Sequence, residues 1–272
     1  MGKAIYNPSG KAGEYSPWAC NFYVGCSNGC EYCYCKKGIL AGVMGQDKPQ
    51  LKKCFRDEKH ALVVFEKELL SNLEQLRRHG LFFSFTTDPL LENTIKLTTG
   101  AVYICLLYDV PVKILTKRAD WISGYRSGDT VIYFPKEIPK KKRNMVAFGF
   151  TLTGHDELEQ GASTNAERIK AMRKLHDAGF KTFASIEPIV DVSDSIWMIA
   201  KCYYFCDLFK VGLMSGKGYD RNELTAMVQH LTSRFDNNLF YFKDSLLKAV
   251  GISRSELPNN CVGQDYNIFK NQ

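Results

Sequence analysis

The chain has 272 residues, a formal net charge of +7 at neutral pH and a composition, 45% hydrophobic and 24% charged, that is typical of globular proteins. It therefore has enough apolar residues for a full core, and a charge of this size permits a phosphate-bearing partner without requiring one. Because no window reaches the roughly 18 apolar residues of a membrane span, and residues 1–10 lack a signal-peptide core and a lipidation pattern, we expect a cytoplasmic protein.

Strands and helices are predicted to alternate along most of the chain. Apolar residues at helical spacing, as in KHALVVFEKELLSNLEQLRRHG, end at a glycine and lead directly into a short strand-like run. The predicted elements, in chain order, are a strand over 19–24, a helix over 60–79, a strand over 81–88, a helix over 94–108, strands over 110–117 and 145–153, a helix over 164–178, a strand over 181–189, a helix over 193–204, a strand over 208–214, a helix over 222–234 and a strand over 238–244, with short helical pieces after residues 117 and 244.

This alternation predicts an α/β fold whose parallel strands are joined by right-handed crossovers. The length suits a partial (βα)6-type TIM barrel with a C-terminal extension. No linker or low-complexity segment interrupts the pattern, so we expect a single domain over residues 1–272, with a core over 18–215 and an extension over 216–272.

The predicted strands are polar on one face and apolar on the other. Parallel strands covered by helices on both faces are usually apolar throughout, so the polar face must line a wet or charged interior. Several of its residues stand at the carboxyl ends of strands, where barrel active sites are built. The polar set comprises Ser84, Thr86, Asp88, Lys113, Lys117, Thr151, Thr153, Ser185 and Glu187.

Ten cysteines are present, and four of them fall within CSNGCEYCYC at 26–35. In a reducing compartment such a cluster indicates metal binding or catalysis before it indicates disulfides. The remaining cysteines stand mostly among apolar or aromatic neighbours, and we expect them to pack in the core. They are Cys20, Cys54, Cys105, Cys202, Cys206 and Cys261.

The spacing of Cys26, Cys30 and Cys33 is Cys-x3-Cys-x2-Cys, with glycines that allow a tight backbone path. Structural zinc usually takes two Cys or His pairs separated by a dozen or more residues, and here the only nearby fourth thiol is Cys35. Three thiolates on a cubane iron–sulfur cluster would leave one iron without a protein ligand. Such an iron is open to a substrate or cofactor.

The stretch CSNGCEYC resembles the signature of the radical S-adenosylmethionine (SAM) enzymes, Cys-x3-Cys-x-aromatic-Cys after the first barrel strand. Four further segments, NFYVGCSNGCEYCY, FSFTTDP, VPVKILTKRADWI and ASIEPIV, are similar in order and spacing to the spore photoproduct lyase-like branch, whose members are often labelled DNA repair photolyases. The resemblance covers most of residues 18–215.

This resemblance implies that Cys26, Cys30 and Cys33 hold a [4Fe-4S] cluster whose fourth iron is chelated by SAM. In the family, reduction cleaves SAM to methionine and a 5′-deoxyadenosyl radical that removes hydrogen from a substrate. A flavodoxin- or ferredoxin-type protein is the implied one-electron donor. Within this branch the implied substrate class is a nucleic acid or nucleotide, undergoing repair, lyase chemistry or modification.

The resemblance also implies SAM contacts. The TTD sequence stands where many relatives have Gly-Gly-Glu, at the position that meets the methionyl amino group, and the lysine of ILTK matches a partner of the methionyl carboxylate. The tyrosine of the motif would lie against the adenine or shield the cluster, a threonine would reach the ribose, and a glutamate would reach the ribose or the substrate. These positions are Thr86, Thr87 and Asp88, then Lys117, Tyr32, Thr151 and Glu187.

Two basic segments are interpreted as surface features rather than as binding sites. The glycines around Lys217 in MSGKGYD suit a flexible turn better than a phosphate site, although backbone N–H groups there are also suited to an anion. The KKKR run at 140–143 precedes a strand, which places it at the barrel end opposite the cluster, so we interpret it as a solvated loop.

Two other classes of function remain open from the sequence. One is a nucleic-acid-binding module stabilised by zinc in the loop 26–35, and the other is an electron-transfer iron–sulfur protein with Cys35 as a fourth ligand. The photoproduct lyase itself returns hydrogen from a protein thiol, and no motif matches such a thiol here. The candidates would be Cys35, Cys105, Cys202 and Cys206.

Overall fold

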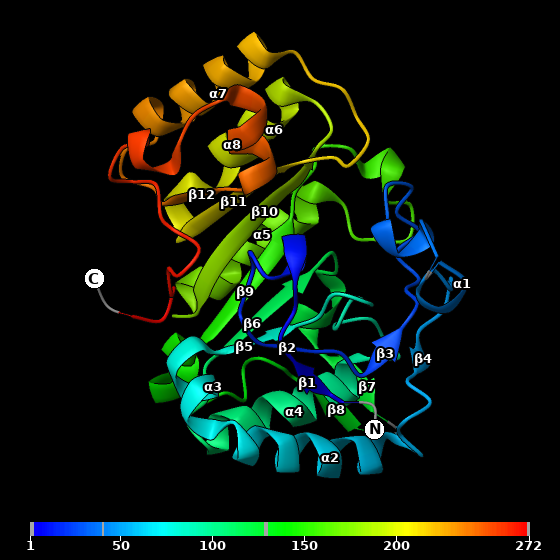
Figure 1. The fold of residues 1–272 in the computed structure, drawn as a ribbon. Helices are drawn as coiled ribbons and strands as arrows, with labels where there is room; N and C mark the ends of the chain where they lie inside the picture. Colours follow the sequence, from blue (N-terminus) through cyan, green and yellow to red (C-terminus); the bar gives the residue numbers. More distant parts are fainter. Residues whose placement is uncertain (1–2, 40, 128–129, 271–272) are drawn as a thin grey trace. The chain divides into compact units, whose positions relative to one another are not determined.

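The computed structural model describes residues 3–39, 41–127 and 130–270 (Figure 1). The chain divides into two compact units. Unit 1 comprises Met1–Ala147 and Glu157–Ser163, and unit 2 comprises Phe148–Asp156 and Thr164–Gln272. The expected single domain over 1–272 stays a prediction.

One sheet contains eight strands of the described chain. Those after β1 succeed one another in chain order with no reversal, which is the order of a (βα) barrel rather than of a doubly wound sheet. Neighbours β2–β5, β5–β6, β10–β11 and β11–β12 pair in parallel, and β1 pairs antiparallel with β2. The predicted α/β class with a mostly parallel sheet is thereby confirmed. The strands are β1 (Ile5–Tyr6), β2 (Ala19–Cys20), β5 (Leu81–Phe83), β6 (Val112–Thr116), β9 (Val146–Thr151), β10 (Lys181–Ile189), β11 (Leu208–Leu213) and β12 (Phe240–Phe242).

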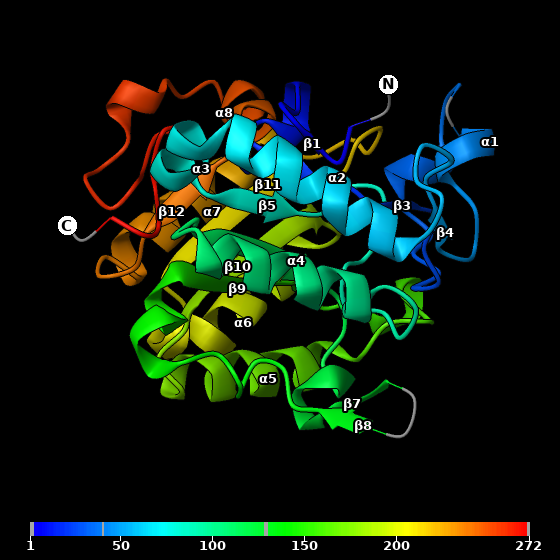
Figure 2. The same cartoon turned by 90° about the horizontal axis from the view of Figure 1, so that it is seen from below.

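In unit 1, the helices α2 (Glu58–Ser71) and α4 (Ile95–Leu107) lie side by side in both views (Figures 1 and 2). Helix α2 begins where the Asp57 side chain accepts a hydrogen bond from the His60 N–H, and it buries Phe65 and Leu69. Two small antiparallel pairs, β3 with β4 and β7 with β8, complete this unit. The elements are α1 (Ala41–Met44), α2 (Glu58–Ser71), α3 (Leu73–His79), α4 (Ile95–Leu107), β3 (Tyr23–Val24), β4 (Gln50–Leu51), β7 (Tyr125–Ser127) and β8 (Thr130–Ile132).

In unit 2, helices alternate with β10, β11 and β12 as the sequence predicts. The first helix begins with a capping box, in which Thr164 and Glu167 satisfy each other's backbone N–H groups. The helices are α5 (Asn165–Asp177), α6 (Val192–Cys202), α7 (Arg221–Arg234) and α8 (Asp244–Val250).

Two predicted strands of unit 1 are wrong in extent. The strand expected over 19–24 is split into β2 and β3. Between them, the Asn21 side chain accepts a hydrogen bond from the Phe85 N–H and donates one to the Tyr6 hydroxyl. The strand expected over 81–88 ends at Phe83, so the polar alternation beyond it belongs to a loop. Strands of two or three residues are too short to show a period in the sequence.

Two further expectations need correction. The basic run 140–143 lies in a 3-10 helix, Lys140–Met145, rather than a loop, and Lys142 donates to the Leu106 carbonyl while Arg143 donates to the Ile138 carbonyl. Of the outlying cysteines, Cys54 is exposed and Cys261 is half-buried, whereas the other four are buried as expected. None of the helices in the described part of the chain has the length and apolar character needed to cross a membrane.

Lys113 is buried near the start of β6, and its Nζ donates to the His79 carbonyl at 3.1 Å. Burial lowers the pKa of this amine from its ordinary 10.5 to about 8. Below pH 8 the buried Lys113 amine is charged in the folded protein, and this charge lowers the free energy of unfolding. That free energy therefore rises as the pH increases from 8 to 10.5. Allowing for the lost hydrogen bond, we expect Lys113→Met to raise the unfolding free energy at pH 7 by about 2 kcal/mol.

Urea unfolding at pH 7 and pH 10 measures this effect. The advantage of Lys113→Met should shrink at the higher pH, while Lys96→Met, at an exposed position of α4, should change stability by less than about 0.5 kcal/mol at either pH. A Lys113→Met protein that is less stable than wild type at pH 7 would contradict the burial cost.

Candidate functional site

The cysteine-rich loop, residues 26–35, follows β3 in unit 1. Its backbone turns at Gly25 and Gly29, which have φ of +82° and +66°, as the predicted tight path requires. The Cys26 N–H donates to the Gln46 carbonyl at 2.9 Å, so the loop is fixed at its first cysteine. Cys30 is buried and Cys26 is partly exposed, so the thiols stand at the boundary between core and solvent.

Asp88 anchors this loop to the end of β6. Its buried carboxylate accepts four hydrogen bonds, from the Leu90 N–H at 3.0 Å, the Thr116 hydroxyl at 2.7 Å, the Lys117 N–H at 2.7 Å and the Asn28 side-chain amide at 2.8 Å. Because both oxygens are engaged, Asp88 acts here as a support for the loop and the end of β6. The sequence predicted instead that it contacts a ligand.

A second support comes from residues 157–163, which we call the strap. The Glu31 N–H donates to the Leu158 carbonyl, and the Gly161 N–H donates to the Asn28 carbonyl, both at 3.0 Å. A side chain at Gly161 would place its Cβ 2.2 Å from the Ser27 carbonyl oxygen. Only glycine lets the strap approach the cysteine loop this closely.

Glu159 of the strap faces two residues that the sequence assigned to the site. Its carboxylate accepts a hydrogen bond from the Tyr32 hydroxyl and lies 4.0 Å from the Lys117 Nζ. The Lys117 ammonium also lies 5.5 Å from the centre of the Tyr32 ring. The Glu159 side chain is fully buried and that of Lys117 is 20% exposed, so the ammonium reaches the boundary with solvent.

Two buried polar atoms beside the cysteine loop have no hydrogen-bond partner within the described residues, namely Asn28 Oδ1 and Thr87 Oγ1. The neighbouring Thr86 is engaged, since its hydroxyl donates to the Tyr23 carbonyl at 2.6 Å. A buried group without a partner costs free energy, so unused atoms of this kind mark places where a ligand gains hydrogen bonds.

The thiols of the loop differ in their electrostatic surroundings. Burial raises the pKa of Cys26 to about 11, and the Asp88 carboxylate acts in the same direction. The pKa of Cys33 is lowered, chiefly because the Cys35 side chain donates a hydrogen bond to it, and that same contact raises the pKa of Cys35. Cys33 is therefore the thiol of this pair that is readier to become a thiolate ligand.

The structure thus gathers Cys26, Cys30, Cys33, Tyr32, Thr86, Thr87, Asp88 and Lys117 in unit 1. Thr151 and Glu187 belong to unit 2. Thr151 is buried at the end of β9, and its carbonyl accepts a hydrogen bond from Arg168. Throughout residues 3–39, 41–127 and 130–270, no three His, Cys, Asp or Glu side chains meet closely enough to hold a metal ion, and the cysteine ligand set stays a prediction.

Glu159 and Asn28 were missed by sequence reasoning. Glu159 follows the strand at 145–153, and its position in a loop after a barrel strand was the available signal. Asn28 lies inside the cysteine motif at a position where the spacing rule accepts any residue.

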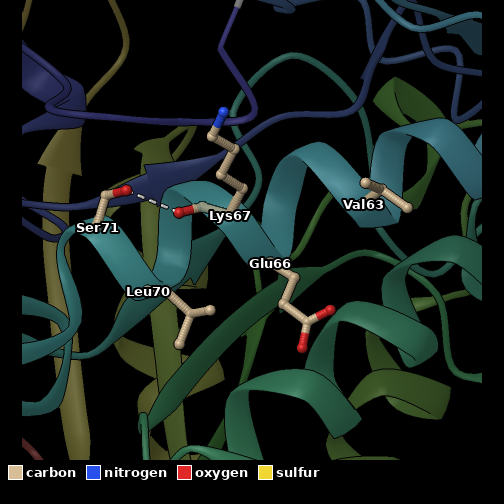
Figure 3. A pocket seen from close by; sticks show the side chains of 5 residues that line it. All are labelled: Val63, Glu66, Lys67, Leu70 and Ser71. Atoms are coloured by element: carbon tan, nitrogen blue, oxygen red, sulfur yellow. Dashed lines mark hydrogen bonds between the residues drawn. The ribbon is translucent and has the colours of Figure 1, made fainter.

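A pocket of about 510 Å³ lies elsewhere in unit 1, along α2 (Figure 3). Its lining side chains all come from that one helix, and Ser71 donates a hydrogen bond to the helix's own Lys67 carbonyl. The pocket contains no thiol, and none of the predicted site residues lines it. The lining residues are Val63, Glu66, Lys67, Leu70 and Ser71.

Two known proteins show similarity to this chain, one in sequence and one in fold. No family model matches the chain. An uncharacterized protein of Methanocaldococcus jannaschii is 24% identical over 199 residues, covering 70% of this chain and 67% of that protein. The crystal structure of Streptococcus suis SuiB bound to the precursor peptide SuiA has a TM-score of 0.56 at 13% identity and covers 89% of this chain and 52% of SuiB.

The chain shares the fold of SuiB, a radical SAM enzyme. A second SuiB structure agrees, with a TM-score of 0.51, 15% identity and coverage of 90% of this chain and 52% of that one. This chain spans about half the length of SuiB. At 13% and 15% sequence identity, these two similarities show a shared fold.

Proposed function

We propose that this protein is a radical SAM enzyme of the spore photoproduct lyase-like branch. In this proposal Cys26, Cys30 and Cys33 hold a [4Fe-4S] cluster, and a SAM molecule completes the coordination of its fourth iron. When bound, the cluster supplies the electron that cleaves SAM to methionine and a 5′-deoxyadenosyl radical. The substrate is proposed to be a nucleic acid or nucleotide, and the electron donor a flavodoxin- or ferredoxin-type protein.

The observation that carries this proposal is the fixed cysteine loop. Three thiols on one short loop suit an iron–sulfur cluster, and hydrogen bonds between the loop and both Asp88 and the strap hold that loop in place. The unused Asn28 Oδ1 and Thr87 Oγ1 lie beside the same loop, where a ligand with an amino group would satisfy them. The three cysteines are thus the proposed cluster ligands, and Asn28 and Thr87 the proposed contacts with the cofactor.

The residues around the cysteine loop have different proposed roles, some in binding SAM and others in orienting the binding side chains. Thr87 offers a free hydroxyl, whereas Thr86 and Asp88 support the loop, so of the three predicted contacts with the methionyl amino group we retain Thr87. Lys117 presents its ammonium to the methionyl carboxylate, and Glu159 orients both Lys117 and Tyr32. Tyr32 covers the loop and limits access of water.

A second candidate function is favoured by the position of Cys35. Its thiol is buried, contacts Cys33 and lies 3.7 Å from the Phe85 carbonyl oxygen. A fourth thiolate from this residue would close the cluster and leave an electron-transfer protein without SAM chemistry.

One anaerobic experiment separates these functions. The reconstituted protein is reduced with dithionite and incubated with SAM, with and without a single-stranded oligonucleotide, and 5′-deoxyadenosine is measured. We expect a brown protein with about four iron and four sulfide per chain that forms this product. A protein that carries the cluster and forms none in either condition would overturn the enzyme assignment, and one colourless zinc per chain would indicate the zinc-stabilised module instead.

Gly161→Ala tests the role of the strap. The added methyl group would meet the Ser27 carbonyl and the Asn28 backbone, which cannot swing aside, so the cysteine loop must shift. We expect a loss of stability of about 1 to 3 kcal/mol and a clear loss of iron per chain after reconstitution. Gly42→Ala, at a position in α1 where a Cβ meets nothing within 4 Å, should retain its iron. Equal iron contents in the two variants would contradict a supporting role for the strap.

A further inference from the structure

Unit 2 carries two consecutive polar rows on one face of its sheet. In the first row, Ser185 of β10, Lys210 of β11 and Tyr241 of β12 are partners in register. The Lys210 Nζ lies 4.9 Å from the centre of the Tyr241 ring. The next residues along the three strands, Ile186, Val211 and Phe242, face the other way and are fully buried. For β10 this agrees with the predicted polar face, which includes Ser185, whereas Lys210 and Tyr241 were not part of the prediction.

The second row contains an acid, a glycine and a lysine. The Lys243 N–H donates to the Val211 carbonyl at 2.9 Å, which places Lys243 directly beyond the end of β12. Its Nζ then reaches across the middle strand to Glu187 Oε2 at 2.8 Å. The space for this crossing comes from Gly212, because a Cβ there would stand 2.8 Å from Lys243 Cδ and 3.0 Å from Glu187 Cδ.

The two ends of this ion pair differ in exposure. The Lys243 side chain is 1% exposed, whereas that of Glu187 is 17% exposed. A buried ion pair contributes little net stability compared with apolar residues of the same volume, because both charges lose their water. The carboxyl ends of parallel strands are also where α/β proteins bind their ligands. The arrangement therefore suits a carboxylate, that of Glu187, which the buried Lys243 holds in place and which a ligand can reach from solvent.

We propose that Lys243 is a positioning residue that fixes the Glu187 carboxylate as the acceptor for a hydroxyl or amino group of a bound nucleoside. This inference rests on the proposed function, in which the substrate is a nucleic acid or nucleotide, and the residues that it concerns, Glu187, Gly212 and Lys243, all belong to unit 2. Lys243 acts through Glu187, since its own side chain is only 1% exposed.

Binding of 5′-deoxyadenosine to the unreduced protein tests this inference without any turnover. Isothermal titration compares the wild type with Glu187→Gln, Lys243→Met and the charge-swapped double variant Glu187→Lys/Lys243→Glu, and thermal unfolding follows each variant. We expect Glu187→Gln and Lys243→Met to bind about tenfold to a hundredfold more weakly, the range expected for loss of a hydrogen bond to a charged group.

The charge-swapped variant separates positioning from structure. It keeps opposite charges on the same two positions, so we expect it to melt at a higher temperature than Lys243→Met. It should still bind weakly, because the carboxylate now occupies the buried end. If the charge-swapped variant recovered both the melting temperature and the nucleoside affinity of the wild type, the pair would be purely structural and the inference would be overturned. Wild-type nucleoside affinity in Glu187→Gln would also overturn it.

Glycine variants and the wild type itself give further outcomes. Gly212→Ala should weaken nucleoside binding by forcing the pair apart, whereas Gly218→Ala, where a Cβ meets nothing within 4 Å, should not. Absence of nucleoside binding in the wild type would also overturn this inference. The proposed function would then still be decided separately, by formation of 5′-deoxyadenosine from SAM.

Discussion

Alanine at Cys26, Cys30 or Cys33, introduced one at a time, will give a folded protein that stays nearly colourless after anaerobic reconstitution. The wild type should carry about four iron atoms per chain, whereas two remaining thiolates cannot hold a cubane cluster. Formation of 5′-deoxyadenosine should be lost with the cluster. Iron and sulfide content, together with circular dichroism to confirm folding, measures this effect.

Two other cysteines provide matched controls. Cys54→Ala changes an exposed thiol away from the loop and should leave iron content unchanged. Cys35→Ala should also keep its cluster if three ligands suffice, although the hydrogen bond to Cys33 is removed. Loss of the cluster in Cys35→Ala would instead favour the four-ligand electron-transfer protein, and full iron content in any of the three ligand variants would contradict the predicted ligand set.

Asp88→Asn should be among the most destabilising single changes in unit 1. Every hydrogen bond to this carboxylate is donated to it, so an amide NH2 group would face donors and leave at least one backbone N–H or side-chain donor unsatisfied. We expect the unfolding free energy to fall by about 3 to 5 kcal/mol, as measured by urea denaturation. The cysteine loop should also become more accessible, since Asn28 loses its anchor.

Thr116→Val is the matched control for this change. It removes one of the four donors and keeps the shape of the side chain, so a cost of about 1 kcal/mol is expected. If Asp88→Asn costs no more than Thr116→Val, the carboxylate does not hold the loop and the end of β6 together. Faster thiol labelling of the cysteine loop in Asp88→Asn than in Thr116→Val would support the anchoring role independently.

The parts of the fold that follow a long apolar period could be predicted from the sequence. The predicted bounds of β10 agree with the structure, those of α7 differ by one residue at its start, and those of α5 differ by one residue at each end. By contrast, β3 and β4 have two residues each and exist only because they pair with each other. No window of the sequence contains that information.

In the candidate site, too, local features could be predicted from the sequence and long-range contacts could not. The cysteine spacing is local, so three ligands could be predicted from it. Lys117 stands directly after β6, and Thr87 was named from the family resemblance. Glu159 meets Tyr32 across 127 residues, and nothing in either neighbourhood indicates the other. Asp88 was assigned to a ligand because an acid at a strand end has the same sequence pattern whether it faces a cofactor or four internal donors.

The strap also bears on the order in which the protein matures during synthesis. Its hydrogen bonds to Glu31 and Asn28 join the cysteine loop to residues near position 160 of a 272-residue chain. During synthesis, the cysteine loop therefore leaves the ribosome before the strap residues that hold it have been translated. Under the proposed function, insertion of an iron–sulfur cluster into a fixed loop would therefore follow translation and docking of the strap.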